Sequence, residues 1–360
     1  MRFALWSMTS PAPGLSHVEI YENQLRECEE AERLGFDHMW FFEHHVSPSS
    51  PIPSPNLMIA AAAQRTRRIR LGAMVNILPY RNPLLLAEEI AMLDTLTRGR
   101  LDMGVGRGLK PVEFDAFGVD QARSRRMFLE SIDVMKRVWA DENFIVERDW
   151  FRIDKKTPLA PGVVQKPHPP FYISAQSAES LRWAAENDVP FAQIDALVEE
   201  CERDCAFYRD IHARAGHSPA PRLVVTREIF VADTDAEARR IAEPFLARYW
   251  ELWGRYAQFT AEGRMPDDYD AWRKRAPVLS KMSFDELAER GLIFVGSPAT
   301  VARQINRHAA RLDILALACV FKFGGMPLST MLGNMRRFAR EVRPLLGASG
   351  SPARSREAGR

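Results

Sequence analysis

Residues 3–42 carry one complete strand–helix–strand pattern. FALWS (3–7) is a short apolar run, VEIYENQLRECEEAERL (18–34) is amphipathic with helical spacing, and HMWFF (38–42) is a second apolar run. Gly35 follows the helical segment directly, where a glycine commonly ends a helix. The stretch predicts two neighbouring strands joined by an outer helix, which is the repeating unit of a parallel α/β fold.

The same alternation continues along the rest of the chain. Further strands are expected at 69–78, 101–105, 171–174, 189–194, 223–231 and 314–321. Further helices are expected at 55–66, 83–96, 124–140, 178–186, 196–214, 235–253 and 328–345. About eight strand–helix units in 360 residues predict an α/β fold of the (β/α)8 TIM-barrel type, with an open doubly wound sheet as the alternative.

Two long segments do not fit a minimal barrel. Residues 141–170, after strand four, are rich in charge and proline, and residues 256–294, after helix seven, are polar and interrupted by Gly263, Pro266 and Pro277. Long insertions of this kind are usually functional loops or lids, and we expect the second to be a lid. The tail 347–360 is rich in Gly, Ser and Arg and is expected to be disordered, so residues 1–346 form the predicted domain.

The composition excludes several classes of protein. Lys plus Arg number 49 and Asp plus Glu 47, so the net charge of +2 argues against a nucleic-acid partner. No apolar run reaches about 18 residues, which argues against a membrane span, and the N-terminal apolar run is too short for a signal peptide. The four cysteines are too dispersed for a disulfide scaffold. These features predict a cytoplasmic, soluble enzyme with no membrane partner.

Three polar residues follow the second predicted strand, and barrel active sites lie at the carboxyl ends of the strands. These residues are Glu43, His44 and His45. A histidine titrates near neutral pH and can act as a base or a metal ligand. Adjacent side chains point in opposite directions from a strand, which disfavours one shared metal ion. We predict His44 as the main catalytic candidate, with His45 and Glu43 beside it and no metal; a purely structural role is the alternative.

A glycine-rich turn follows the fourth strand. Gly106, Arg107 and Gly108 lack the third glycine of a dinucleotide fingerprint, because Leu109 follows and no helix begins there. The glycines would let the backbone approach a ligand, and the guanidinium of Arg107 can bind a phosphate through two hydrogen bonds. The alternative is a tight turn that carries a surface arginine.

A helix start follows the fifth strand at Ala175, Gln176 and Ser177, with Ser180 one turn later. Hydroxyls and free N–H groups at a helix start can bind an anion, although an ordinary helix cap has the same pattern. Together with Asn76 after strand three, the barrel mouth offers a phosphate site, a histidine and apolar side chains, without an obvious nucleophile. Such a site suits an organic cofactor that carries the chemistry itself.

Taken together, these segments resemble the bacterial luciferase-like flavin monooxygenases. The similarity extends over about residues 1–345, and its motifs are specific in combination rather than singly. The matching segments are WFFEHH (40–45), LGAMVNILP (71–79), LDTLTRGRL (93–101), GRG (106–108), PFYISAQS (170–177), EIFVAD (228–233) and GSPATV (296–301).

The resemblance implies a TIM barrel that binds reduced FMN without a covalent bond. It implies that O2 adds to the flavin as a C4a-peroxyflavin, which oxidises an apolar organic substrate such as an aldehyde or ketone. A separate flavin reductase would supply the FMNH2. A homodimer would form through the helices at 55–66 and 83–96, with packing of these helices against the barrel as the alternative. A deazaflavin-dependent dehydrogenase and a non-catalytic flavin-binding barrel are the alternative functions, and FAD or a deazaflavin the alternative cofactors.

The resemblance also implies roles for single residues. His44 would be the catalytic histidine, and Arg107, Ser177 and Ser180 would bind the flavin phosphate. A non-prolyl cis peptide would lie under the flavin ring at Met74–Val75. Gly106 and Gln176 depart from the luciferase α subunit, so light emission is not implied. The predicted apolar lining of the mouth is Trp6, Met8, Trp40, Phe42, Met74 and Ile77.

Overall fold

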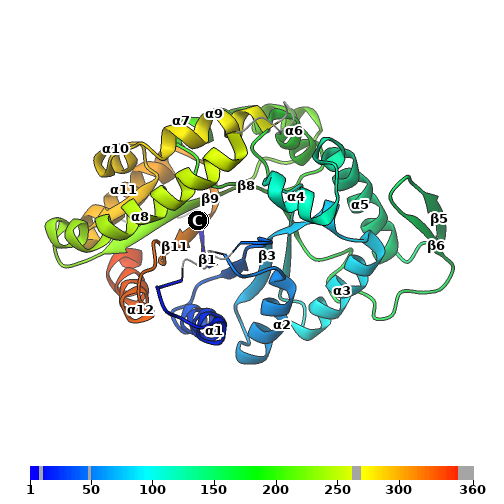
Figure 1. Cartoon of the computed structure of the whole chain (residues 1–360), viewed down its shortest axis with the longest axis horizontal. Helices are drawn as coiled ribbons and strands as arrows, with labels where there is room; N and C mark the ends of the chain where they lie inside the picture. The colour runs from blue at the N-terminus through cyan, green and yellow to red at the C-terminus, as the bar shows by residue number, and fades with distance from the viewer. Residues whose placement is uncertain (8–10, 48–49, 262–268, 348–360) are drawn as a thin grey trace, which may run out of the picture.

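The computed structural model describes residues 1–7, 11–47, 50–261 and 269–347 (Figure 1). Eight parallel strands of this part of the chain close into a ring, because β8 pairs with β9 and β11 pairs with β1. The ring strands, in spatial order, are β1 (Arg2–Ser7), β2 (His38–Phe41), β3 (Arg70–Ile77), β4 (Leu101–Gly106), β7 (Phe171–Ser174), β8 (Phe191–Gln193), β9 (Leu223–Val231) and β11 (Ile314–Val320). The predicted (β/α)8 barrel is confirmed.

Helices surround the ring, and Figure 1 shows them as an outer layer. Polar residues begin several of them: Ser16 forms a capping box with Glu19, and Asn82 accepts hydrogen bonds from two backbone N–H groups. The helices that connect ring strands are α1 (His17–Arg33), α2 (Pro55–Arg65), α3 (Pro83–Leu96), α5 (Ser124–Trp139), α6 (Ala178–Glu186), α7 (Val198–Arg214), α8 (Asp235–Ala261) and α11 (Pro298–Arg311), and α12 (Leu328–Arg337) follows β11. No helix of the described residues is long and apolar enough to cross a membrane.

The first insertion contains regular structure that the sequence did not predict. Within residues 141–170, β5 (Phe144–Glu147) and β6 (Arg152–Lys155) form an antiparallel hairpin. Each strand alternates buried and exposed residues, and Phe144 and Val146 face the core. The strands are only four residues long and charged on one face, so composition alone suggested a loop.

The second insertion is also more ordered than expected. Helix α8 continues to Ala261, and α9 (Asp270–Leu279), α10 (Phe284–Glu289) and β10 (Ile293–Gly296) follow. Strand β10 pairs with the carboxyl-terminal part of β9, with Ile293 opposite Glu228. The sequence prediction missed β10 and α11 as well as α4 (Pro111–Phe117), because each is short or directly follows another element. Residues 262–268 of the expected lid, and the expected disordered tail from 348 onward, lie outside the described residues.

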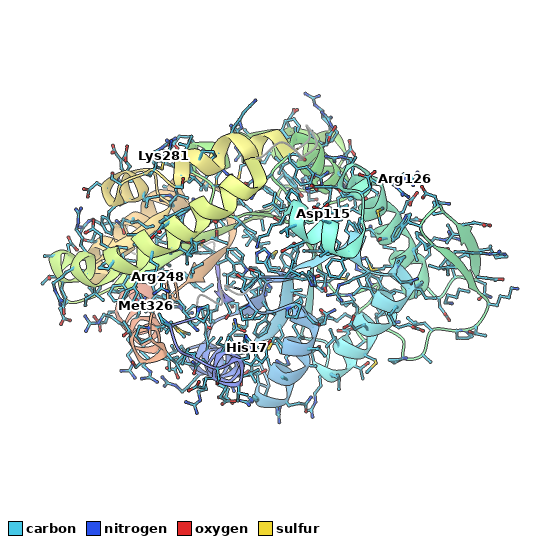
Figure 2. All side chains as sticks on the ribbon, in the orientation of Figure 1. His17, Asp115, Arg126, Arg248, Lys281 and Met326 are labelled. Carbon is cyan, nitrogen blue, oxygen red and sulfur yellow. The ribbon has the colours of Figure 1, made fainter. Side chains whose placement is uncertain are left out.

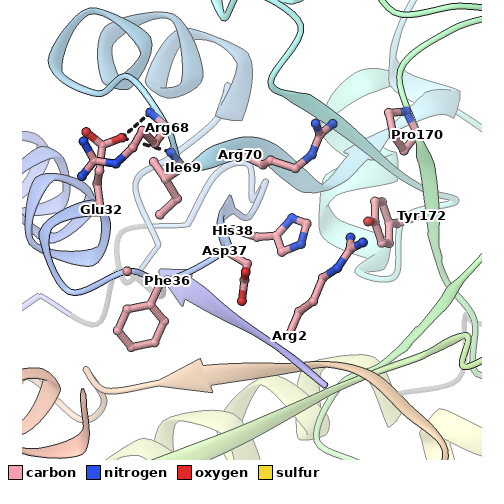
Figure 3. A pocket seen from close by; sticks show the side chains of 11 residues that line it. Arg2, Glu32, Phe36, Asp37, His38, Arg68, Ile69, Arg70, Pro170 and Tyr172 are labelled. Atoms are coloured by element: carbon pink, nitrogen blue, oxygen red, sulfur yellow. Dashed lines mark hydrogen bonds between the residues drawn. The ribbon is translucent and has the colours of Figure 1, made fainter. Parts of the chain in front are cut away.

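A buried polar network closes the amino-terminal end of the barrel. Asp102 accepts hydrogen bonds from His38 Nδ1 (2.6 Å), Trp40 Nε1 (3.2 Å) and Arg70 Nε (2.7 Å). Burial alone would raise the pKa of Asp102, but the interactions with His38 and Arg70 outweigh it and hold the pKa below its usual value. His38 and Arg70 of this network also line a pocket of about 630 Å³, together with Arg2 and Tyr172 (Figure 3).

Candidate active site

His44 forms a close pair with a glutamate from α4. Its Nδ1 lies 3.1 Å from Oε1 of Glu113, which is almost completely buried. Burial would raise the pKa of Glu113, but His44 and Lys110 outweigh it and lower that pKa. Glu113 is therefore a carboxylate that accepts the Nδ1 proton, which leaves Nε2 of His44 as the acceptor nitrogen.

The electrostatic surroundings keep His44 neutral. Burial lowers the pKa of His44, and the positive charge of Lys110 lowers it further against the opposing effect of Glu113. The side chain remains about one-third exposed. A neutral, partly accessible imidazole held by a carboxylate can accept a proton from a bound ligand.

His45 pairs with a different carboxylate. Its Nε2 lies 2.8 Å from Oε1 of Glu43, whose other oxygen accepts hydrogen bonds from the N–H of Ile77 and from Arg81 Nη2. The backbone N–H of His45 donates a hydrogen bond to Oε1 of Glu113. Glu43 and His45 thus tie the loop after β2 to β3 and α4, and this loop presents His44.

Strands β3 and β4 lie close together at the end of the barrel that carries the His44–Glu113 pair. The peptide bond between Met74 and Val75 is cis, as the resemblance implied. A Cβ atom at Gly106 would lie 2.5 Å from Val75 Cγ2, so a larger residue there would require the Val75 side chain to shift. Asn76 is 1% exposed, and neither Nδ2 nor Oδ1 of its amide has a hydrogen-bond partner among the described residues. A buried amide in this state is an available ligand-binding group.

Hydroxyl and guanidinium groups gather at the start of α6. Ser177 is the N-cap: its Oγ accepts from the Ser180 N–H (3.3 Å) and donates to Ser180 Oγ (3.0 Å). Arg125 of α5 reaches Ser177 Oγ at 3.5 Å and forms an ion pair with Glu179. The helix N-terminus and this guanidinium together favour an anion.

Arg107 enters the same end of the barrel from β4, which pairs with β7. Its guanidinium lies 4.7 Å from the ring centre of Tyr269, whose hydroxyl donates to the carbonyl of Gly108. The segment that begins at Tyr269 therefore lies against the Arg107 turn. Among the other predicted positions, Gln176 accepts a hydrogen bond from Arg275 Nη2 of α9. Ala175 is buried directly after β7, and its N–H donates to the carbonyl of Ala192 in β8.

The structure brings most predicted site residues to one end of the barrel, and it adds four that the sequence analysis did not select. Glu113, Arg125, Tyr269 and Arg275 all come from helices or insertions rather than from strand ends. A weak signal existed for Glu113, since Pro111 and an acidic residue two positions later are typical of a first helical turn. Met8, from the predicted apolar lining, lies outside the described residues. Among those residues, no three His, Cys, Asp or Glu side chains gather as a metal site would require.

Comparisons with known proteins identify the family of this chain. The family model described as luciferase-like monooxygenase matches residues 1–313. The oxygenase component of a flavin-dependent trigonelline monooxygenase from Acinetobacter baylyi is 28% identical over 244 residues, 66% of this chain and 67% of that protein. The 3,6-diketocamphane 1,6-monooxygenase of Pseudomonas putida is 27% identical over 331 residues, 82% of this chain and 84% of that protein.

Solved structures share the fold. The oxygenating constituent of 3,6-diketocamphane monooxygenase from Pseudomonas putida, in complex with FMN, has a TM-score of 0.80 at 24% identity and covers 96% of this chain and 99% of its own. An F420-dependent secondary alcohol dehydrogenase has a TM-score of 0.72 at 16% identity and covers 96% and 98%. From the match over most of its length, this chain belongs to the luciferase-like monooxygenase family and is an oxidoreductase of that class.

Proposed function

We propose that the chain is the oxygenase component of a two-component flavin monooxygenase. It takes FMNH2 from a separate reductase and consumes it with O2 and an apolar organic substrate. One oxygen atom enters the substrate, and FMN and water leave. The observation that carries the proposal is the His44–Glu113 pair, which lies at the same end of the barrel as the anion site of Arg107, Arg125 and Ser177.

The residues present fit FMN. Arg107, Arg125 and the start of α6 would hold a phosphate. The cis peptide and Asn76, whose buried amide has no partner among the described residues, would lie against the ring system. When bound and reduced, FMN supplies the electrons that activate O2.

The protein's own contribution is proton control and the exclusion of water. Glu113 fixes the tautomer of His44 and leaves Nε2 ready to accept or hold a proton at the reacting centre. Trp40, predicted for the apolar lining, instead bonds Asp102 at the opposite end of the barrel. The buried aromatic side chains of Trp6 and Phe42 add apolar surface near the carboxyl-terminal strand ends. These side chains favour an apolar substrate, with an aldehyde or ketone as the preferred class.

We also propose that the active form is a cytoplasmic homodimer joined through α2 and α3. Three large apolar side chains of these helices are mostly exposed, Leu57 (71%), Leu85 (65%) and Met92 (53%), and exposed apolar side chains on neighbouring helices favour association. Sedimentation of wild-type protein and of a Leu57→Glu, Leu85→Glu double variant tests this. The wild type should sediment as a dimer and the variant as a monomer.

An anaerobic titration followed by isotope labelling tests the main proposal. The protein should bind FMNH2 in preference to reduced F420. With ¹⁸O2 and a panel of apolar aldehydes, ketones and alkenes, it should add one ¹⁸O atom to a product that mass spectrometry detects. Tight binding of F420 with substrate oxidation and no ¹⁸O in the product would identify a dehydrogenase instead. Flavin binding without any turnover would identify a non-catalytic barrel.

A further inference from the structure

Strand β9 lies directly across the barrel from the proposed flavin wall. In the ring order β1-β2-β3-β4-β7-β8-β9-β11, β9 is four strands from β3 in either direction. β3 carries the cis peptide and Asn76. A residue that points inward from β9 therefore faces a molecule bound against β3.

Glu228 is such a residue. The preceding residue, Arg227, contacts Cys201 of the outer helix α7, with Nη2 3.9 Å from Sγ. Because successive side chains of a strand point to opposite faces, Glu228 points into the barrel. It is 1% exposed, and its Oε1 has no hydrogen-bond partner among the described residues.

Trp6 lies close to the same level of the barrel. Ser7 donates to Glu27 of α1 on the outside of the ring, so Trp6 points inward. The strand registers pair Leu5 with Cys319 and Glu228 with Val320, which sets Trp6 and Glu228 on either side of Val320. Glu228 therefore lies at the same level of the barrel as the buried indole of Trp6, two strands away.

The surroundings of Glu228 favour its uncharged form. Burial raises the pKa of Glu228 well above its usual value, and Asp195 raises it further, against the weaker effects of a hydrogen bond from its own backbone N–H and of Arg227. Asp195 is held by its N–H bond to Thr226 Oγ1 and by the hydroxyl of Tyr249, which donates to Oδ2 at 3.4 Å. A neutral carboxyl is a hydrogen-bond donor, and a buried donor calls for a partner.

We propose that Glu228 recognises the substrate: its buried, inward-pointing carboxyl group donates a hydrogen bond to the carbonyl oxygen of an apolar ketone or aldehyde that lies between β9 and the flavin wall. The inference deepens the proposed function and rests on it. The hydrogen bond from Glu228 selects carbonyl compounds over alkenes and saturated hydrocarbons.

The physical reason for this selectivity is the cost of an unmade hydrogen bond. A carbonyl oxygen accepts the proton of Glu228, whereas a hydrocarbon of the same length leaves the donor buried and unpaired. The same bond strengthens as negative charge develops on the carbonyl oxygen during attack on its carbon.

The first test is an infrared measurement that needs no flavin. The spectrum of the wild-type protein at neutral pH should contain the C=O stretch of a protonated carboxyl, and Glu228→Gln should remove it. Glu289→Gln, at an exposed position of α10, is the matched control and should leave the band in place. Absence of a band that depends on Glu228 would overturn the inference.

The second test compares decan-2-one with decane in the FMN-loaded protein. The wild type should prefer the ketone and lower its C=O stretching frequency. Glu228→Gln retains a donor and should bind the ketone within about threefold of wild type. Glu228→Leu should weaken ketone binding about tenfold or more without weakening decane, because no buried donor is then left unpaired. An equal loss for both ligands would overturn the inference, and so would a wild type without ketone preference, including one that binds neither.

The two proposals fail in different ways. FMN affinity is measured in the same samples. A wild-type protein that does not bind FMN but shows the carboxyl band of Glu228 would refute the proposed function alone. Normal FMN binding and ¹⁸O incorporation without the carboxyl band or the ketone preference would refute the role of Glu228 alone.

Discussion

Selected buried polar side chains at the two ends of the barrel differ in whether they have hydrogen-bond partners. At the amino-terminal end, both carboxylate oxygens of Asp102 are hydrogen-bonded, and His38, Trp40 and Arg70 are the donors. At the carboxyl-terminal end, the amide of Asn76 and Oε1 of Glu228 are buried without a hydrogen-bond partner among the described residues.

This difference separates stability from function. A buried network with satisfied bonds rigidifies its surroundings, whereas a buried polar group without a partner costs folding free energy. A protein retains such a cost where a ligand supplies the missing partner. Barrels follow this division generally, with stabilising residues at one end and reactive residues at the other.

The largest expected effect is on stability, at the amino-terminal end. Asp102→Ala removes the acceptor of three donors and leaves the Arg70 charge without its partner, so the free energy of unfolding should fall by about 3–5 kcal/mol. Urea denaturation measures this fall, and FMN affinity of the folded variant should not change. A fall below about 1 kcal/mol would mean that the network contributes little to stability.

The next effect is catalytic, at the other end. His44→Ala removes the group that accepts the proton, and turnover should fall by about 10²–10⁴-fold while the Kd for FMN stays constant. Steady-state kinetics and flavin fluorescence measure the two quantities. His17→Ala, at the exposed start of α1, is the control and should behave as wild type. Unchanged turnover in the His44 variant would remove this residue from the mechanism.

Arg107→Ala tests the anion site. Loss of a charged hydrogen bond to phosphate should weaken FMN about 10- to 100-fold and leave riboflavin affinity unchanged, because riboflavin has no phosphate. Arg126→Ala is the control, since that side chain is paired with Asp149 on the surface. An equal loss of both ligands would argue for a structural role of Arg107.

The pH dependence of turnover follows from the surroundings of His44. The pKa of His44 is lowered, so the imidazole is neutral at and above the usual histidine value of about 6.5. Turnover should be constant from about pH 8 down to 6.5 and then fall up to tenfold per pH unit below the lowered pKa. The residual turnover of His44→Gln should lack this acid limb. An acid limb that begins above pH 7 would contradict the lowered pKa.

The smallest expected effect is the most direct test of the comparison. Asn76→Leu removes an amide without hydrogen bonds, so the free energy of unfolding should stay within about 1 kcal/mol of wild type while FMN binding weakens. Asn334→Leu is the matched control, because its buried amide bonds the backbone of Ile229 and Val231. That variant should lose about 1–3 kcal/mol. Equal losses would show that Asn76 is as structural as Asn334.

The sequence predicted the candidate site unevenly. His44, Arg107 and Ser177 were selected because polar residues after apolar runs mark strand ends, and the cis bond at Met74–Val75 followed from family resemblance. The sequence analysis did not select Glu113, because it lies 69 residues from His44 in a short helix with no strong periodic pattern. Glu228 was not selected for a different reason. It lies within an apolar strand, and its position in the sequence does not tell whether its side chain points to the inner or the outer face of the barrel.

By itself, the sequence determined the strand–helix period, the barrel and the set of polar residues at the strand ends, because these depend on local spacing and on side chains close along the chain. Only the tertiary structure decided which groups meet: Glu113 with His44, Arg125 with Ser177, and Glu228 opposite β3. Those pairings depend on how the ring closes and on where the helices and insertions pack against it. Closure of the barrel brings together residues that are far apart in the sequence, and local periodicity does not predict such contacts.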